Sequence, residues 1–166
     1  IGMEFGILMW WEGLTVQDWE RFKNELPGVE FSDATDLIWK LRMIKSPWEI
    51  DVMRQLFRAT SKGYQKIIQN AAVGANEKDL FYDALKIWID ERIIESTNYT
   101  YSCLNAVHSY RDRCLKNGDW ILLDGGPSYK GYHADVQRIV FIGDPGREVR
   151  RMGNLAGRVL NAMEDF

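Results

Sequence analysis

The chain has 166 residues, of which 46% are apolar and 27% charged. This balance excludes an intrinsically disordered chain, and the length suits one ordinary globular domain or parts of two. The formal net charge of −3 provides no broad cationic field, which argues against nucleic acid or an anionic membrane surface as a partner. No apolar run reaches the ~18 to 20 residues that would span a bilayer.

Two cysteines, Cys103 and Cys114, are too few for a disulfide framework and are typical of reduced thiols in a cytoplasmic protein. The chain begins with Ile1 and ends at Phe166, inside a predicted amphipathic helix. We therefore expect both ends to be cuts through a longer protein.

Residues 1–44 have the pattern of short elements that cannot enclose a hydrophobic core of their own. The sequence predicts a buried strand over 4–10, a helix capped by Thr15 and ending before Pro27, a brief strand over 29–31, and a short helix starting at Ser32 or Asp33. We interpret this segment as the C-terminal part of an N-terminal domain, followed by a linker.

A strong helix start follows at residues 46–49. Ser46 offers an N-cap oxygen, Pro47 suits the first helical position, and Glu49 completes a capping box. The helix is predicted to end at Val73-Gly74, and its apolar stripe comprises Ile50, Met53, Phe57, Tyr64 and Ile67. A second helix is predicted over about 77–94, capped by Asn76 and lined by Leu80, Phe81, Ala84 and Trp88.

The composition then changes to a β type over 99–107. Trp120 to Leu123 is a continuous apolar run of strand length, and a strand pattern resumes over 129–142. The final helix is marked by Val149, Met152, Ala156, Val159 and Met163. This order predicts an α+β fold whose sheet still needs to be covered and completed.

The residues with the clearest chemical potential lie between Leu123 and Arg138. A hairpin centred between residues 129 and 130 would place Asp124 directly opposite Asp135, and two carboxylates so close imply a metal, a shared proton or a nearby arginine. Mn²⁺ or Mg²⁺ would accept these oxygens, although two carboxylates are too few for a tight site. Spacing alone leaves a structural alternative, in which Asp124 forms a turn before Gly-Gly and Asp135 pairs with Arg138.

Several motifs together resemble the creatinase/aminopeptidase P/prolidase family, the pita-bread metallopeptidases (M24). The chain contains Asp124-Gly125-Gly126, then Gly131-Tyr132, Asp135-Val136-Gln137-Arg138 and Gly143-Asp144-Pro145, in the order of that family's first metal-binding strands. Upstream, residues 41–50 are similar to the family's junction between its two domains, and Asn117-Gly118-Asp119 is similar to the turn before its first ligand strand.

The resemblance implies the tail of a creatinase-like N-terminal domain over 1–44 and the first half of a pita-bread catalytic domain over 45–166. It also implies that Asp124 and Asp135 are two ligands of a site for two divalent ions, usually Mn²⁺, Co²⁺ or Zn²⁺, with Asp135 bridging both. Such a pair of ions activates a water that attacks the scissile carbonyl. The family's later His and two Glu ligands have no counterpart in this sequence.

Two positions depart from the family pattern. His108 lies close to where family peptidases carry a histidine that contacts the substrate, but here it belongs to His108-Ser109-Tyr110, and a structural role is the alternative. Gln137 replaces a threonine that would support the site, and Arg138 is expected to pair with a carboxylate.

The resemblance leaves three functional hypotheses. The first is a fragment of an Xaa-Pro aminopeptidase or prolidase-like enzyme that acts on small peptides and is inactive as this truncated chain. The second is a creatinase-like or ectoine-hydrolase-like enzyme that cleaves a small amide or amidine, and the third is a catalytically silent interaction module. An incomplete sheet also predicts a homodimer or other self-association.

Overall fold

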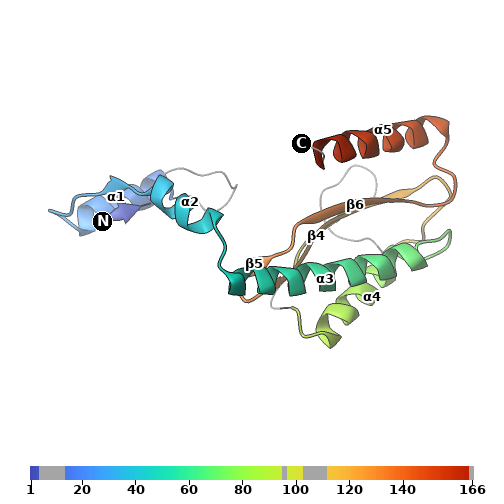
Figure 1. Cartoon of the computed structure of the whole chain (residues 1–166), viewed down its shortest axis with the longest axis horizontal. Helices are drawn as coiled ribbons and strands as arrows, with labels where there is room; N and C mark the ends of the chain where they lie inside the picture. The colour runs from blue at the N-terminus through green and yellow to red at the C-terminus, as the bar shows by residue number, and fades with distance from the viewer. Residues whose placement is uncertain (4–13, 95–96, 103–111, 165–166) are drawn as a thin grey trace. The chain divides into compact units, whose positions relative to one another are not determined.

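The computed structural model describes residues 1–3, 14–94, 97–102 and 112–164. The chain divides into two compact units, Ile1–Trp48 and Glu49–Phe166 (Figure 1). The predicted strand over 4–10 lies outside the described residues. The assignment of the first unit to a creatinase-like domain, with a boundary at residues 44–45, stays a prediction.

The first unit contains two helices and a pair of very short strands. Strand β1 (Gly2–Met3) pairs in parallel with β2 (Ser32–Asp33), and the helices are α1 (Val16–Glu25) and α2 (Thr35–Met43). Thr15 caps α1 as predicted, because its hydroxyl accepts a hydrogen bond from the Asp18 amide at 3.1 Å.

The predicted strand over 29–31 is wrong. Pairing occurs at β2 instead, because the Ser32 amide donates to the Ile1 carbonyl at 3.0 Å and the Ala34 amide donates to the Met3 carbonyl at 2.8 Å. The helix expected to start at Ser32 or Asp33 begins at Thr35, whose amide donates to the Asp33 carboxylate at 2.9 Å.

Helix α3 (Pro47–Asn70) begins at Pro47, as its capping signals predict. Its buried face differs from the predicted stripe, since Ile50 remains 38% exposed and Phe57 is only half-buried. The sequence offers two overlapping apolar series on this helix, and the one that packs is Val52, Leu56, Ala59, Thr60, Gly63, Tyr64 and Ile67.

Helix α4 (Glu77–Asp90) is capped by Asn76, whose side-chain oxygen accepts a hydrogen bond from the Lys78 amide at 2.9 Å. The four side chains predicted to line this helix are all buried. The helix ends four residues before the predicted end at 94, and Arg92 follows with a φ of 58°, which a right-handed helix does not tolerate.

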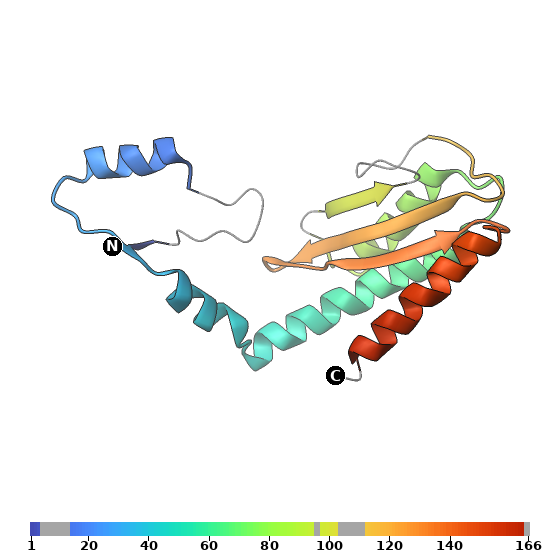
Figure 2. The same cartoon turned by 90° about the horizontal axis from the view of Figure 1, so that it is seen from above.

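The sheet of the second unit contains β3 (Thr97–Ser102), β4 (Trp120–Tyr129), β5 (Tyr132–His133) and β6 (Val136–Phe141). All its pairs are antiparallel, and β4 is the central strand, flanked by β3 on one side and by β5 and β6 on the other (Figure 2). The core lies between this sheet and helices α3 and α4, and includes Leu56, Ile67, Trp88, Ile121, Leu123 and Ile142.

Helix α5 (Arg147–Glu164) follows the Gly-Asp-Pro-Gly break after β6, and its five predicted apolar positions lie within it. Helices α3 and α4 lie on one side of the sheet and α5 lies on the other (Figure 1). The mixed helix and sheet content confirms the predicted α+β class.

Candidate metal-binding site

The two aspartates of the predicted metal site lie on the β4 hairpin, in a register that differs from the predicted one. Asp124 is paired with Gln137, and Gly125 is paired with Val136. The direct pairing of Asp124 with Asp135 is therefore wrong by two positions. The hairpin turns at Lys130-Gly131, which take φ values of 51° and 78°, instead of at residues 129 and 130.

The register shift leaves the two aspartates on the same face of the sheet, because it is an even number of residues. Asp124 follows the fully buried Leu123 and is half-buried, whereas Asp135 follows the buried Ala134 and is exposed. Alternation and burial together assign both carboxylates to the face opposite α3 and α4. They are diagonal neighbours, since Asp135 precedes the partner of Asp124 by two residues.

Helix α3 supports the hairpin from the opposite face at this position. Tyr64 is 3% exposed, and its hydroxyl lies 3.0 Å from the Gly125 carbonyl oxygen and 2.7 Å from the Val136 carbonyl oxygen. Gly126 leaves no room for a side chain, because a Cβ atom there would lie 2.7 Å from the Ala134 Cβ. The residues around both aspartates are thus held against α3.

The donor set fits part of the shell of a hard divalent cation. Two carboxylates with water can hold such an ion, and a tight site requires more protein oxygens. Within the part of the chain that the structure describes, no three His, Cys, Asp or Glu side chains gather as a metal site. His108 lies outside the described residues, so its role as a substrate contact stays a prediction.

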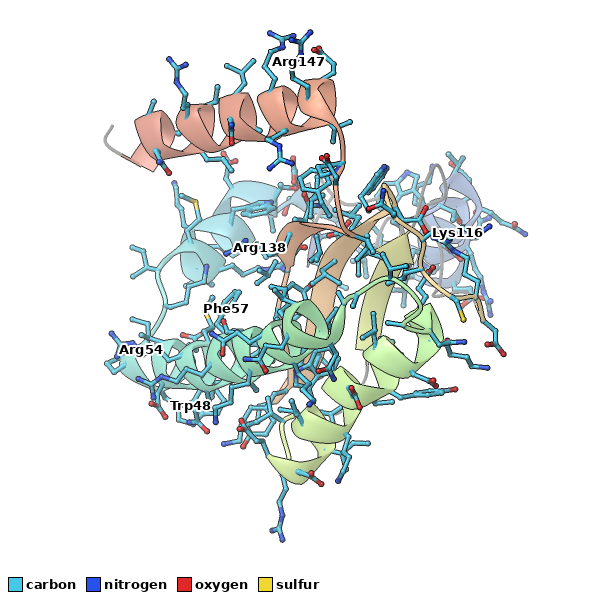
Figure 3. All side chains as sticks on the ribbon, turned by 90° about the vertical axis from the view of Figure 1, so that its right-hand side faces the viewer. Trp48, Arg54, Phe57, Lys116, Arg138 and Arg147 are labelled. Atoms are coloured by element: carbon cyan, nitrogen blue, oxygen red, sulfur yellow. The ribbon has the colours of Figure 1, made fainter. Side chains whose placement is uncertain are left out.

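Arg138 was expected to pair with a carboxylate, but it donates to the backbone carbonyl of Gln137 at 2.6 Å. Its side chain extends from β6, while Arg54 and Phe57 extend from α3 (Figure 3). Gln137 is exposed beside Asp124, where the resemblance places a threonine. The longer side chain is accommodated because position 137 is exposed to solvent.

A separate polar cluster fixes the segment that leads into β4. Arg113 donates to the fully buried Glu77 carboxylate at 3.0 Å and to the Asp119 carboxylate at 2.8 Å. The Lys116 amide also donates to Asp119 at 2.9 Å. This amide is the main reason that the pKa of Asp119 is lowered; Arg113 lowers it further and burial acts in the opposite direction. The cluster is structural, since Arg113 bridges the two carboxylates.

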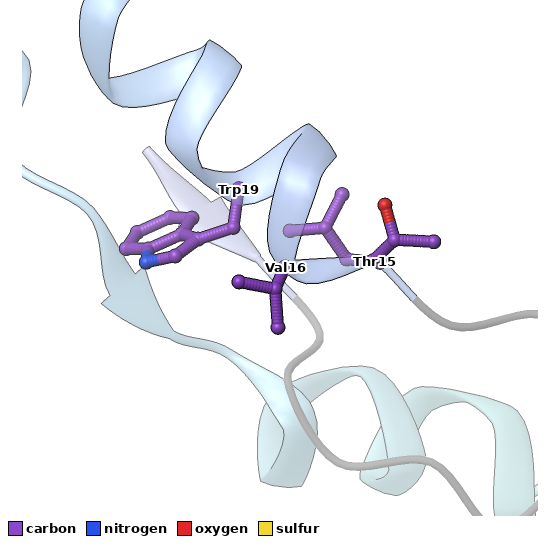
Figure 4. Close-up of a pocket in the computed structure, with 4 residues that line it drawn as sticks. Thr15, Val16 and Trp19 are labelled. Atoms are coloured by element: carbon purple, nitrogen blue, oxygen red, sulfur yellow. The ribbon is translucent and has the colours of Figure 1, made fainter.

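The first unit contains a small hollow lined by Leu14, Thr15, Val16 and Trp19 (Figure 4). Among the described residues that line it, three are apolar and none is titratable. None of the helices in the described ranges has a stretch long and apolar enough to cross a lipid bilayer.

Comparison with known proteins identifies the class to which this fold and hairpin belong. The sequence profile of metallopeptidase family M24 matches residues 51–165, and the chain belongs to this family. The fold agrees with solved pita-bread enzymes. The chain superimposes on the prolidase from Pyrococcus horikoshii with a TM-score of 0.74 and 20% identity, over 99% of this chain and 46% of that one. With the prolidase from Pyrococcus furiosus the TM-score is 0.71 at 22% identity, over 90% of this chain and 44% of that one.

Curated relatives carry hydrolase names. The chain is 29% identical to the probable dipeptidase PepE of Mycobacterium tuberculosis, over 78% of this chain and 36% of the relative. It is 24% identical to the Xaa-Pro dipeptidase of Pyrococcus furiosus, over 80% of this chain and 40% of the relative. It is 27% identical to the ectoine hydrolase of Halomonas elongata, over 85% of this chain and 39% of the relative. The chain thus spans about two-fifths of the length of these relatives.

Sequence reasoning missed the role of Tyr64. Its position on the apolar stripe predicts a core residue, which is correct for the ring but says nothing of the hydroxyl. Only a hairpin seated on α3 brings the carbonyls of Gly125 and Val136 to that oxygen. The sequence signal that could have indicated this role is a tyrosine among aliphatic core positions, because a buried hydroxyl requires a hydrogen-bond partner.

Proposed function

We propose that this chain is the first metal-binding part of a hydrolase for small Xaa-Pro peptides that uses two divalent ions, and that Asp124 and Asp135 supply its first carboxylate ligands. The observation that carries the proposal is the placement of both aspartates on one face of the β4 hairpin, within the residues that match family M24. The names of the dipeptidase relatives support the choice of substrate.

Mn²⁺, Co²⁺ or Zn²⁺, when bound, would lower the pKa of a water and stabilise the oxyanion formed at the scissile carbonyl. The contribution of this chain is to orient two carboxylates toward the face of the sheet opposite α3 and α4. His108 is proposed as a substrate contact. A cytoplasmic location is part of the proposal and is supported by the two cysteines.

The proposal predicts weak metal binding by this chain, because two carboxylates provide fewer ligands than two ions need. Mn²⁺ titration by calorimetry should give a low-affinity isotherm that Asp124→Asn and Asp135→Asn each weaken. Asp36→Asn on α2 is the control and should leave the isotherm unchanged. An isotherm insensitive to both site variants would contradict the ligand assignment, and tight binding at two sites would contradict the incompleteness of the ligand set.

The same reasoning predicts no peptidase activity for this chain alone. Incubation with Xaa-Pro dipeptides and Mn²⁺, followed by chromatography of released proline, should show no turnover above the metal-only reaction. Turnover that Asp124→Asn abolishes would contradict this expectation and assign a complete active site to the 166 residues.

A creatinase-like or ectoine-hydrolase-like enzyme that cleaves a small amide or amidine is the second candidate. It is favoured by the 27% identity to an ectoine hydrolase and by Gln137 in place of the family threonine beside Asp124. The two candidates differ in substrate. A protein of the relatives' full length should release proline from Xaa-Pro dipeptides under the first proposal and open a cyclic amidine under the second.

We further propose that the chain self-associates. Helix α5 exposes apolar side chains along one stripe, including Met152 at 60%, Val159 at 51% and Met163 at 68%. On β6, Ile139 is 56% exposed. A second copy could cover these surfaces.

A further inference from the structure

Tyr64 on α3 places a single hydroxyl between the two segments that carry the aspartates. Its oxygen lies 3.0 Å from the carbonyl oxygen of Gly125 and 2.7 Å from that of Val136. Gly125 directly follows Asp124, and Val136 directly follows Asp135. One side chain therefore binds the backbone immediately after each candidate metal ligand.

The contact lies where strand pairing is interrupted. Strand β5 ends at His133 and β6 begins at Val136, so Ala134 and Asp135 belong to neither strand. The pairing register is nevertheless the same on both sides of the interruption. A hydroxyl has one proton to donate, so both carbonyl oxygens must stay close to the same oxygen atom to share it. The Ala134 amide still donates to the Pro127 carbonyl at 3.1 Å. The Tyr64 hydroxyl thus adds a second tie between β4 and the returning segment, beside the break between β5 and β6.

Thr60 on α3 contacts the same part of the hairpin through an apolar group. Thr60 lies one turn before Tyr64, and its hydroxyl donates to the Leu56 carbonyl within the helix at 2.9 Å. Its methyl group approaches Gly126, where an added Cβ would lie 3.2 Å away. Thr60 packs against the hairpin, whereas Tyr64 fixes its backbone through polar contacts.

We propose that Tyr64 is a positioning residue for the carboxylate pair, whose hydroxyl sets the spacing between Asp124 and Asp135 from the opposite face of the sheet. This inference rests on the proposed function of the two aspartates as metal ligands. Tyr64 acts through the backbone that follows each aspartate and is not itself proposed as a ligand.

Tyr64→Phe tests the inference, because it keeps the buried ring and removes only the hydroxyl. The matched control is Tyr132→Phe, which removes a hydroxyl bonded to Glu49 at 2.5 Å. Amide hydrogen exchange, followed by NMR in the full 166-residue chain, should accelerate about five- to ten-fold over 124–126 and 134–137 in Tyr64→Phe, the effect of one lost hydrogen bond. Exchange in α4 should stay as in the wild type. Unchanged exchange at the hairpin, or equal acceleration in α4, would overturn the inference.

Paramagnetic broadening by Mn²⁺ alone separates this inference from the proposed function. Substoichiometric Mn²⁺ should broaden the amide signals of 124–126 and 135–137 in the wild type and in Tyr132→Phe, and about three-fold less in Tyr64→Phe. Equal broadening in all three proteins would overturn the role of Tyr64 and leave the metal ligands in place. A wild-type chain without local broadening would overturn the proposed function, and the role of Tyr64 with it.

Discussion

At the residue scale, Asp119, in the segment before β4, makes the stability of the protein depend on pH. Its pKa is lowered, chiefly by the Lys116 amide, and Arg113 contributes in the same direction. The folded state therefore binds the proton less readily than the unfolded state. The resulting stabilisation is fully present above the unfolded pKa of about 3.9 and is lost as the pH falls through the folded pKa.

We predict that Asp119→Asn lowers stability at pH 7 and reduces the further loss of stability on acidification. Urea midpoints measured between neutral and acidic pH would test this, with Asp36→Asn as the control. Curves for the wild type and Asp119→Asn that stay parallel down to acidic pH would contradict a lowered pKa in the folded state.

Gly126 is the second residue whose substitution should change the stability of the protein. An alanine Cβ there would meet the Ala134 Cβ at 2.7 Å and the Ala134 carbonyl oxygen at 3.1 Å. Because the second contact is with backbone, the hairpin has to shift, and we expect Gly126→Ala to cost about 1–3 kcal/mol. Urea denaturation measures the change.

Gly157→Ala serves as the control for Gly126→Ala. No atom lies within 4 Å of a Cβ atom at Gly157 on α5, so helix propensity should make this variant neutral or more stable by about 0.5–1 kcal/mol. A Gly126→Ala protein as stable as the wild type would show that Gly126 and Ala134 do not approach each other this closely.

At the element scale, α3 and α4 meet through Gly63 and Trp88. The indole nitrogen of Trp88 donates to the Ala59 carbonyl at 2.9 Å, and Trp88 is fully buried. A Cβ atom at Gly63 would lie 2.6 Å from that nitrogen. The close approach of the two helices therefore depends on a glycine at this position.

We predict that Gly63→Ala destabilises the protein by about 1–3 kcal/mol, since the clash exceeds the gain in helix propensity. It should also change the intrinsic fluorescence of the native state, to which Trp88 contributes as one of seven tryptophans. Gly153→Ala, where the nearest ring atom of Phe141 would lie at 3.6 Å, is the control and should have little effect. Equal stability of the two variants would argue against this helix crossing.

At the scale of the whole molecule, the apolar stripe of α5 predicts concentration-dependent association. Sedimentation velocity should show a rising weight-average coefficient as concentration increases. Val159→Glu should suppress the rise, while Asn154→Glu, which adds the same charge away from the stripe, should not. A stable monomer at high concentration would contradict self-association through this face.

The elements were the most predictable part of the fold. Pro47 and Asn76 mark helix starts by local hydrogen-bonding rules, and the aliphatic run of β4 marks a strand by its composition. The buried face of α3 was less predictable, because apolar residues occupy two overlapping series and only the contact with α4 and the sheet selects the Val52 series. Local pattern cannot decide between faces that are equally apolar.

The candidate site, like the fold, was predictable from the sequence only in part. The sequence by itself determined the family resemblance, and the choice of Asp124 and Asp135 as a pair follows from their motifs. Tertiary structure decided the register, because the turn at Lys130-Gly131 needs two left-handed residues and moves every pairing by two positions. It also decided the role of Tyr64, since a hydroxyl on one helix meets carbonyls distant in sequence only after the hairpin packs on α3.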